Sequence, residues 1–138
     1  MEVDERFKGK WKKPKTPHRK LNEYLWAVLY PEGLKLADYV DIGVFTAIMA
    51  RSGVEIRKNA QIGPHCAIYS ESTIDGKKGK IVIEEGAKIG AFTMVMPGVR
   101  IGKGAIVGAH SFVNKDIPAG EMWAGVPAKR LRGAAKKT

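Results

Sequence analysis

The most regular feature of the chain is an aliphatic residue at every sixth position over its central and C-terminal parts. Three runs keep this spacing, and gaps of eight and nine residues separate them. The aliphatic positions are Leu36, Ile42, Ile48, Ile56, Ile62, Ile68, Ile74, Ile83, Ile89, Val95, Ile101, Val107 and Val113. A helix repeats its apolar residues every three or four positions and an exposed strand every two, so neither explains the pattern.

A six-residue repeat is typical of a parallel β-helix, in which three short segments make one triangular turn. Strands of successive turns then pair in parallel, and the aliphatic side chains form ladders inside the coil. The pattern therefore predicts an all-β domain over residues 36–118. Glycines directly after the aliphatic residue, such as Gly43 and Gly90, are predicted to allow a positive φ at the corners. The polar segment 75–80, DGKKGK, is predicted to leave the repeat as a loop.

The flanking segments depart from the repeat. Residues 1–35 are predicted to form a basic arm followed by a short amphipathic helix that caps the first coil. Its apolar residues are Leu21, Tyr24, Leu25, Val28 and Leu29, and Pro31 ends the pattern. Residues 119–138 are predicted to be a tail that runs back along the coil or over to a neighbouring subunit. The charged first residues and the single cysteine favour a cytoplasmic protein.

The net charge of +10 is concentrated at the two ends of the chain. Residues 1–20 contain eight Lys or Arg against three acids, and residues 126–138 contain five against none, so the body is neutral. A nucleic-acid-binding domain carries its positive charge on the folded surface, which disfavours that class. Solvation, binding of cofactor phosphates and contact with an anionic membrane are the alternatives for the basic ends.

Residues 96–131, MPGVRIGKGAIVGAHSFVNKDIPAGEMWAGVPAKRL, resemble the C-terminal signature of the hexapeptide-repeat acyltransferases, closest to the sugar O- and N-acetyltransferases. The resemblance implies a left-handed coil and a homotrimer with no metal. It also implies that acetyl-CoA, bound between subunits, gives its acetyl group to a hydroxyl or amine of a small polar acceptor, most simply a sugar or nucleotide-sugar.

The same resemblance assigns residues to the cofactor. Asn114 and Lys115 match a pair beside the nucleotide of CoA, and Lys129 and Arg130 are placed to meet its phosphates, where ionic hydrogen bonds are strong. The pantetheine arm is expected to follow the backbone near Gly108 and Ala109, with His110 at the thioester end.

His65 is the candidate general base. It follows Ile62 by three positions, and its neighbour Cys66 takes the interior position, so the imidazole should point outward. Histidine side chains titrate near neutral pH and suit proton abstraction from an attacking hydroxyl. Many relatives have a loop histidine that segment 75–80 lacks, so a carboxylate such as Asp75, or an amine acceptor that needs no base, is the alternative.

Three further side chains flank the loop and could hydrogen-bond an acceptor or, equally, the loop's own backbone. They are Tyr69, Ser70 and Asp75. Two other functions use the same fold. One is a non-catalytic trimeric scaffold that binds through its basic ends. The other is a carbonic-anhydrase-like zinc enzyme, which needs three histidines on one metal, whereas the third histidine here, His18, lies in the arm.

Overall fold

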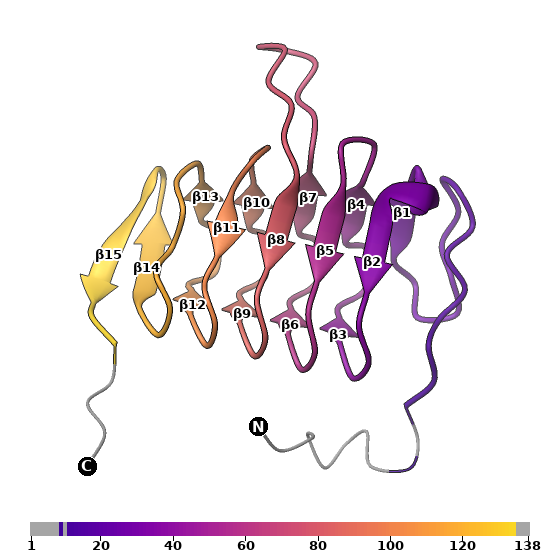
Figure 1. Cartoon of the computed structure of the whole chain (residues 1–138), viewed down its shortest axis with the longest axis horizontal. Helices are drawn as coiled ribbons and strands as arrows, with labels where there is room; N and C mark the ends of the chain where they lie inside the picture. The colour runs from indigo at the N-terminus through magenta and orange to yellow at the C-terminus, as the bar shows by residue number, and fades with distance from the viewer. Residues whose placement is uncertain (1–8, 10, 135–138) are drawn as a thin grey trace.

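The computed structural model describes residue 9 and residues 11–134, and shows a parallel β-solenoid of about five turns (Figure 1). The predicted all-β coil is thus confirmed. No α-helix occurs among the described residues, and one 3-10 turn, Pro31–Gly33, precedes the second strand. Within the same part of the chain, no helix has the length and apolarity needed to cross a membrane.

The strands form three sheets, one on each side of the coil. Sheet A contains β1 (Ala27–Leu29), β4 (Ala47–Met49), β7 (Ala67–Tyr69), β10 (Met94–Val95) and β13 (Phe112–Val113). Sheet B contains β2 (Leu34–Leu36), β5 (Val54–Ile56), β8 (Ile81–Ile83) and β11 (Arg100–Ile101). Sheet C contains β3 (Asp41–Ile42), β6 (Gln61–Ile62), β9 (Lys88–Ile89), β12 (Ile106–Val107), β14 (Met122–Gly125) and β15 (Ala128–Arg132).

The core consists of the aliphatic ladders that the repeat predicts. In sheet A, Ile48 pairs with Ile68 and Ile68 with Val95, and all three side chains are fully buried. Ile56 pairs with Ile83 in sheet B in the same way. Full burial of such a side chain stabilises the fold by roughly 1.5–3 kcal/mol, so the ladders are the main source of stability.

Ile74 was expected in the ladder, and this expectation is wrong. Its side chain is 98% exposed, and residues 70–80 form a hairpin-like loop between β7 and β8, closed by a bridge between Glu71 and Lys78. Figure 1 shows this loop standing out from the coil. The loop therefore begins ahead of the predicted segment 75–80. The six-residue spacing of Ile74 from Ile68 is coincidental, because the interior position after Ile68 is filled by Ile83.

The predicted capping helix is also wrong. Residues 27–29 form β1, and Val28 pairs with Ile48 in parallel and is 1% exposed. The gap of eight from Val28 to Leu36 matches the gap of eight from Ile48 to Ile56, so the chain makes one more turn ahead of the predicted boundary at 36. Parallel pairing of residues 27–29 with β4 therefore decides the structure of this segment, although its apolar residues have the spacing of a helix. The part of the arm at residues 1–8 and 10 lies outside the described residues.

The predicted C-terminal tail first adds one more strand to the coil and then runs back along it, which is one of the two courses expected for it. Strand β14 pairs in parallel with β12, and β15 then turns back antiparallel along β14. These two strands cover the exposed edge that β12 would otherwise present, which a solenoid needs at its end. Residues 135–138 lie outside the described part of the chain.

The glycines that follow the aliphatic residues are required for a reason other than the predicted one. None of Gly43, Gly63, Gly90, Gly102 and Gly108 has a positive φ. A Cβ atom at Gly90 would instead lie 2.5 Å from the backbone nitrogen of Ala109 in the next turn, and one at Gly43 would lie 2.3 Å from that of Pro64. These glycines therefore allow successive turns to approach at one corner of the coil.

The outer face of sheet B carries a row of alternating charges. Glu55 accepts hydrogen bonds from Arg57 Nε at 2.8 Å and from Lys80 Nζ at 3.0 Å, and Arg57 also pairs with Glu84. Glu84 accepts a further bond from Arg100 Nη2 at 3.0 Å. These contacts, Arg57 first and Lys80 second, lower the pKa of Glu55 to about 2. The row thus joins three turns of the solenoid.

The depressed pKa of Glu55 predicts an acid-sensitive contribution to stability. Because the carboxylate is favoured in the folded state, its contribution is complete above the ordinary pKa of about 4.5 and is lost as the pH falls toward about 2. The Glu55→Gln variant should lose about 1 kcal/mol of unfolding free energy at pH 7 and match the parent protein near pH 2. Urea titrations across this pH range measure both, with the exposed Glu32→Gln as the control. A constant difference between Glu55→Gln and the parent would contradict the assignment.

Candidate active site

A cavity at the C-terminal end of the solenoid brings together four of the predicted cofactor residues. It has a volume of about 350 Å³, and its lining includes Asn114, Lys115, Lys129 and Arg130. Asn114 and Lys115 follow the last strand of sheet A, whereas Lys129 and Arg130 belong to β15 in sheet C. Two segments 15 residues apart therefore converge on one concave, positively charged surface. Such a surface suits an anionic ligand such as a phosphate.

Trp123 completes the wall of this cavity. Glu121 fixes two of the lining side chains: it accepts a hydrogen bond from Trp123 Nε1 at 3.0 Å, and its other oxygen lies 3.7 Å from Arg130 Nη1. Lys115 and Lys129 have no ion pair within the described part of the chain, so both ammonium groups are available to a ligand.

Gly108 does not fit its predicted role as a backbone contact for pantetheine. Its N–H donates to the carbonyl of Trp123 at 2.9 Å, and its carbonyl accepts from the hydroxyls of Ser111 at 2.6 Å and Thr93 at 3.3 Å. All its hydrogen-bonding capacity serves the stacking of turns. Ala109, the next residue, is exposed beside the corner of the coil.

Both predicted site histidines belong to one column of rings, which we call the ring column and define as Phe45, His65, Phe92 and His110. The centroids of Phe45 and His65 are 5.3 Å apart, those of His65 and Phe92 4.8 Å, and those of Phe92 and His110 5.0 Å. The last two pairs are parallel within 2°. All four side chains are exposed. The outward orientation predicted for His65 is thus confirmed.

The backbone explains why the rings stack. Each ring residue lies at the corner between sheets C and A and has a positive φ of 56–61°. In this conformation the N–H of His65 donates to the carbonyl of Val44, that of Phe92 to Pro64 and that of His110 to Ala91. Successive turns therefore place equivalent side chains one above another. The ring column is a consequence of the coil, with Leu25 in the same conformation at its N-terminal end.

Sequence reasoning missed Phe45 and Phe92, although a signal was present. Both stand three positions after an aliphatic ladder residue, Ile42 and Ile89, as His65 and His110 do after Ile62 and Val107. The shared position in the repeat would have placed all four on one corner.

The acceptor candidates beside the loop have different surroundings. Ser70 is fully buried, and its hydroxyl donates to the carbonyl of Met49 at 2.8 Å and accepts from Ser52 N–H at 3.0 Å, so it anchors the base of the loop and cannot face an acceptor. Asp75 is exposed and accepts from the N–H of Lys77, a contact that lowers the pKa of its carboxyl group and weakens it as a base. Tyr69 ends β7 with a half-buried side chain.

Cys66 is buried, as the repeat predicts. It is 2% exposed, and its thiol lies 3.2 Å from the carbonyl oxygen of Gly90. Burial raises the pKa of the thiol, which disfavours the nucleophilic thiolate. Among the described residues, no three His, Cys, Asp or Glu side chains are grouped so that they could hold a metal ion.

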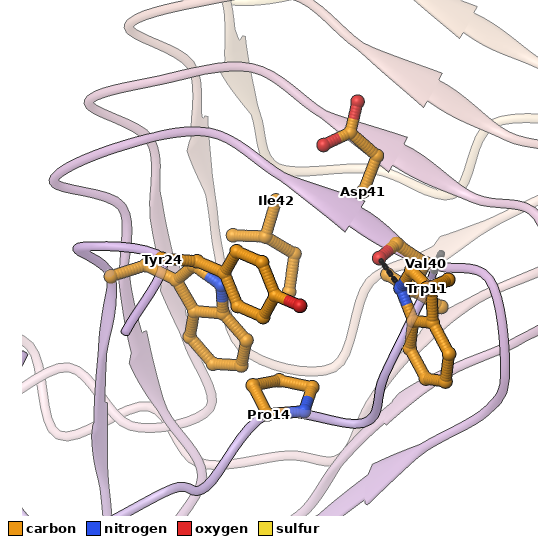
Figure 2. A pocket seen from close by; sticks show the side chains of 7 residues that line it. Trp11, Pro14, Tyr24, Val40, Asp41 and Ile42 are labelled. Carbon is orange, nitrogen blue, oxygen red and sulfur yellow. Dashed lines mark hydrogen bonds between the residues drawn. The ribbon is translucent and has the colours of Figure 1, made fainter. Parts of the chain in front are cut away.

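A second, small cavity lies at the other end of the coil, where the arm crosses the first turn (Figure 2). Its volume is about 30 Å³, and Trp11, Tyr24 and Trp26 are among its lining residues. Trp11 Nε1 donates to the carbonyl of Val40 at 3.2 Å, the bond drawn in Figure 2. The arm thus covers the open end of the core in place of the expected helix.

Part of the solenoid matches a known protein family. Residues 80–115 match the model of the bacterial transferase hexapeptide family, described as six repeats. The same stretch contains His110, Phe92 and the pair Asn114–Lys115. Over these residues the chain carries the hexapeptide repeat of that family. Its neighbours among solved structures agree with the solenoid seen here.

Two such structures are named for acetyltransferases. A hexapeptide-repeat acetyltransferase from Vibrio cholerae, solved with acetyl coenzyme A, is 26% identical, with a TM-score of 0.76 over 80% of this chain and 66% of that one. A galactoside acetyltransferase in complex with coenzyme A is 26% identical, with a TM-score of 0.72 over 78% of this chain and 58% of that one.

The curated relatives are longer. A 2,3,4,5-tetrahydropyridine-2,6-dicarboxylate N-acetyltransferase of Staphylococcus aureus is 46% identical over 56 residues, which is 41% of this chain and 23% of the relative. The chain therefore spans about a quarter of the length of the curated relatives that it matches. The likeness concerns the repeat and leaves the acceptor open.

Proposed function

We propose that the protein is an acetyl-CoA-dependent acetyltransferase whose acceptor is a small polar molecule, most simply a sugar or nucleotide-sugar. The observation that carries this proposal is the convergence of Asn114, Lys115, Lys129 and Arg130 on one cavity. It is supported by two structural neighbours that hold acetyl coenzyme A or coenzyme A. The phosphates of the cofactor meet the cationic cavity, and its pantetheine arm runs past Ala109 and His110 along the ring column.

His65 is the proposed general base. Its imidazole is exposed in the middle of the ring column, between Phe45 and Phe92, on the path assigned to the thioester. The acceptor hydroxyl gives its proton to His65 as its oxygen attacks the thioester carbonyl. The C–S bond then breaks, the acetyl group stays on the acceptor, and the departing CoA sulfur recovers the proton.

We also propose that the protein acts as a homotrimer in the cytoplasm, where CoA thioesters are available. The exposure of the ring column and of Ile74 at the loop supports assembly, because large apolar side chains exposed in a single chain favour contact with a partner. A closed ring of identical subunits needs two different complementary surfaces. The loop and the ring column lie at different corners of the coil, as such a ring requires.

The proposal is tested by a calorimetric titration with acetyl-CoA, using the parent protein and Lys129→Glu. We expect saturable binding near one molecule per subunit for the parent. Loss of an ionic hydrogen bond and gain of a repulsive charge should raise the Kd of the variant by about 10- to 100-fold. Arg132→Glu makes the same charge change on the same strand, outside the cavity, and should change the Kd much less.

Two outcomes would contradict the assignment. Equal affinity for the parent and Lys129→Glu would remove Lys129 from the site. Absence of binding to the parent at millimolar acetyl-CoA would favour the non-catalytic scaffold.

A further inference from the structure

A second cationic surface lies at the end of the solenoid opposite the proposed cofactor cavity (Figure 1). It is formed by residues 11–25, which cross the first turn and which we call the arm end. The segment carries one acid, Glu23, and five basic side chains, which are Lys12, Lys13, Lys15, Arg19 and Lys20. Within the described part of the chain only Lys13 pairs with a carboxylate, that of Asp38 at 3.6 Å. All five are exposed, so the other four are available to an anionic partner.

Large apolar side chains are exposed on the same surface. Leu21 is 48% exposed, Tyr24 42% and Leu25 46%. Two of them lie directly beside cationic residues. The hydroxyl of Tyr24 donates to the carbonyl of Lys12 at 3.3 Å, and Leu21 follows Lys20 in the segment that pairs with β1. Cations beside exposed apolar side chains are typical of a surface that lies on an anionic membrane, where the cations meet the headgroups and the apolar groups reach the acyl-chain boundary.

The backbone of the apolar turn is hydrogen-bonded within the protein. The N–H of Tyr24 donates to the side-chain oxygen of Asn22 and that of Leu25 to the main-chain carbonyl of Asn22, both at 2.9 Å. The carbonyl of Leu25 accepts from the N–H of Phe45 at 2.6 Å. Polar backbone groups without partners are costly in an apolar layer. Because these groups already have partners, the turn can approach the acyl chains of a membrane without that cost.

A nucleic acid is the other polyanion that a cationic surface suits, but the side chains of the arm end disfavour it. Single strands bind to aromatic rings on which their bases stack. Both tryptophans of the arm end are engaged in the fold: Trp26 is 2% exposed, and Trp11 Nε1 donates to the carbonyl of Val40 at 3.2 Å. A leucine offers a base neither a ring nor a hydrogen bond, so the exposed Leu21 and Leu25 favour lipid.

We propose that the arm end docks the protein on a membrane that contains anionic phospholipid. Its unpaired cations attract the phosphates of the headgroups, and Leu21, Tyr24 and Leu25 enter the boundary between headgroups and acyl chains. The cavity lined by Lys115 and Lys129 lies at the other end of the solenoid, so docking leaves it open to solution. This inference does not depend on the proposed function.

The test is co-sedimentation of the full chain with vesicles. One set is pure phosphatidylcholine, and the other contains equal parts of phosphatidylcholine and phosphatidylglycerol. We expect the parent protein to bind the anionic vesicles and to leave the neutral ones unbound. Removal of two charges, in the double variant Lys15→Gln and Lys20→Gln, should lower the partition coefficient about 10- to 30-fold.

Two further variants separate the arm end from the general charge of the protein. The double variant Lys88→Gln and Lys103→Gln removes the same charge from exposed positions on the middle turns and should bind the vesicles like the parent. The Leu21→Gln variant keeps every charge and should lower the partition coefficient about threefold or more, because the exposed part of the leucine no longer leaves water on docking. Native mass should be the same in all four proteins.

Four results would overturn the inference. The first two are equal binding of the parent to both kinds of vesicle and an equal loss of binding in the two double variants. The third is full binding by Leu21→Gln, which would leave the apolar side chains without a role. The fourth is release of the parent from anionic vesicles by duplex DNA at an equal concentration of phosphate, which would assign the arm end to nucleic acid.

Discussion

Replacement of His65 by alanine is expected to lower kcat for acetyl transfer to a hydroxyl by about 10²- to 10⁴-fold, the usual contribution of a positioned general base. The Kd for acetyl-CoA should change by less than about twofold, because the residues assigned to the phosphates lie in the cavity at the C-terminal end. The measurement is steady-state release of the CoA thiol with a saturating acceptor, together with the calorimetric titration.

A second variant separates base catalysis from ring packing. His65 stacks on Phe92 at 4.8 Å and contacts Phe45 at 5.3 Å, so alanine also interrupts the ring column. The His65→Phe variant retains a ring but has no basic nitrogen. It should be as stable as the parent and as slow as His65→Ala. The His18→Ala variant removes an imidazole outside the ring column and should keep the parent's kcat.

An unchanged kcat in both His65 variants would remove this residue from the chemistry. The remaining explanation would be an amine acceptor that enters neutral, since the Asp75 carboxyl group has a lowered pKa and is a weaker base. A loss in His65→Ala that His65→Phe restores would instead show that the ring, and not the nitrogen, matters.

The second large effect concerns stability. Replacement of Gly90 by alanine is expected to lower the free energy of unfolding by about 3 kcal/mol or more. The new Cβ would lie 2.5 Å from the nitrogen and 2.8 Å from the Cα of Ala109. Both are backbone atoms of the next turn, and Gly90 N–H donates to Val107 in that same turn, so neither side can move without breaking ladder bonds.

Urea unfolding followed by tryptophan fluorescence measures this effect. Gly133→Ala is the matched control, because its Cβ meets no atom within 4 Å and its φ is not positive. Failure of Gly90→Ala to fold while Gly133→Ala folds normally would also agree with the prediction. Equal stability of the two variants would show that the turns can separate at this corner.

Several features were predictable from the sequence for one physical reason. In a coil whose turns stack in register, each side of the coil has one interior position per six-residue segment. Interior positions therefore recur every six residues, and the residues of the aliphatic ladders can be identified from the sequence. The same regularity located Cys66 inside and His65 outside. The residues proposed to bind the cofactor could be selected because the segments after Val113 and Pro127 resemble those of the family.

Other features depended on pairing partners distant in sequence. The apolar spacing around Val28 predicted a helix. As a strand, this segment instead forms backbone hydrogen bonds with β4 and places Val28 in a buried position opposite Ile48. A helix would make neither contact. Ile74 matched the spacing of six, yet the next strand of sheet B begins only at Ile81, so the chain between them leaves the coil.

The chain by itself determined the period, the interior ladders and the charge at its ends, because each is a local property repeated along it. Only the tertiary structure decided which residues meet: the cavity formed by Lys115 and Lys129 and the stacking of Phe45 on His65. It also decided why Gly90 cannot carry a side chain. Each of these depends on how one turn lies against the next, and that distance is set by hydrogen bonds between strands about 20 residues apart.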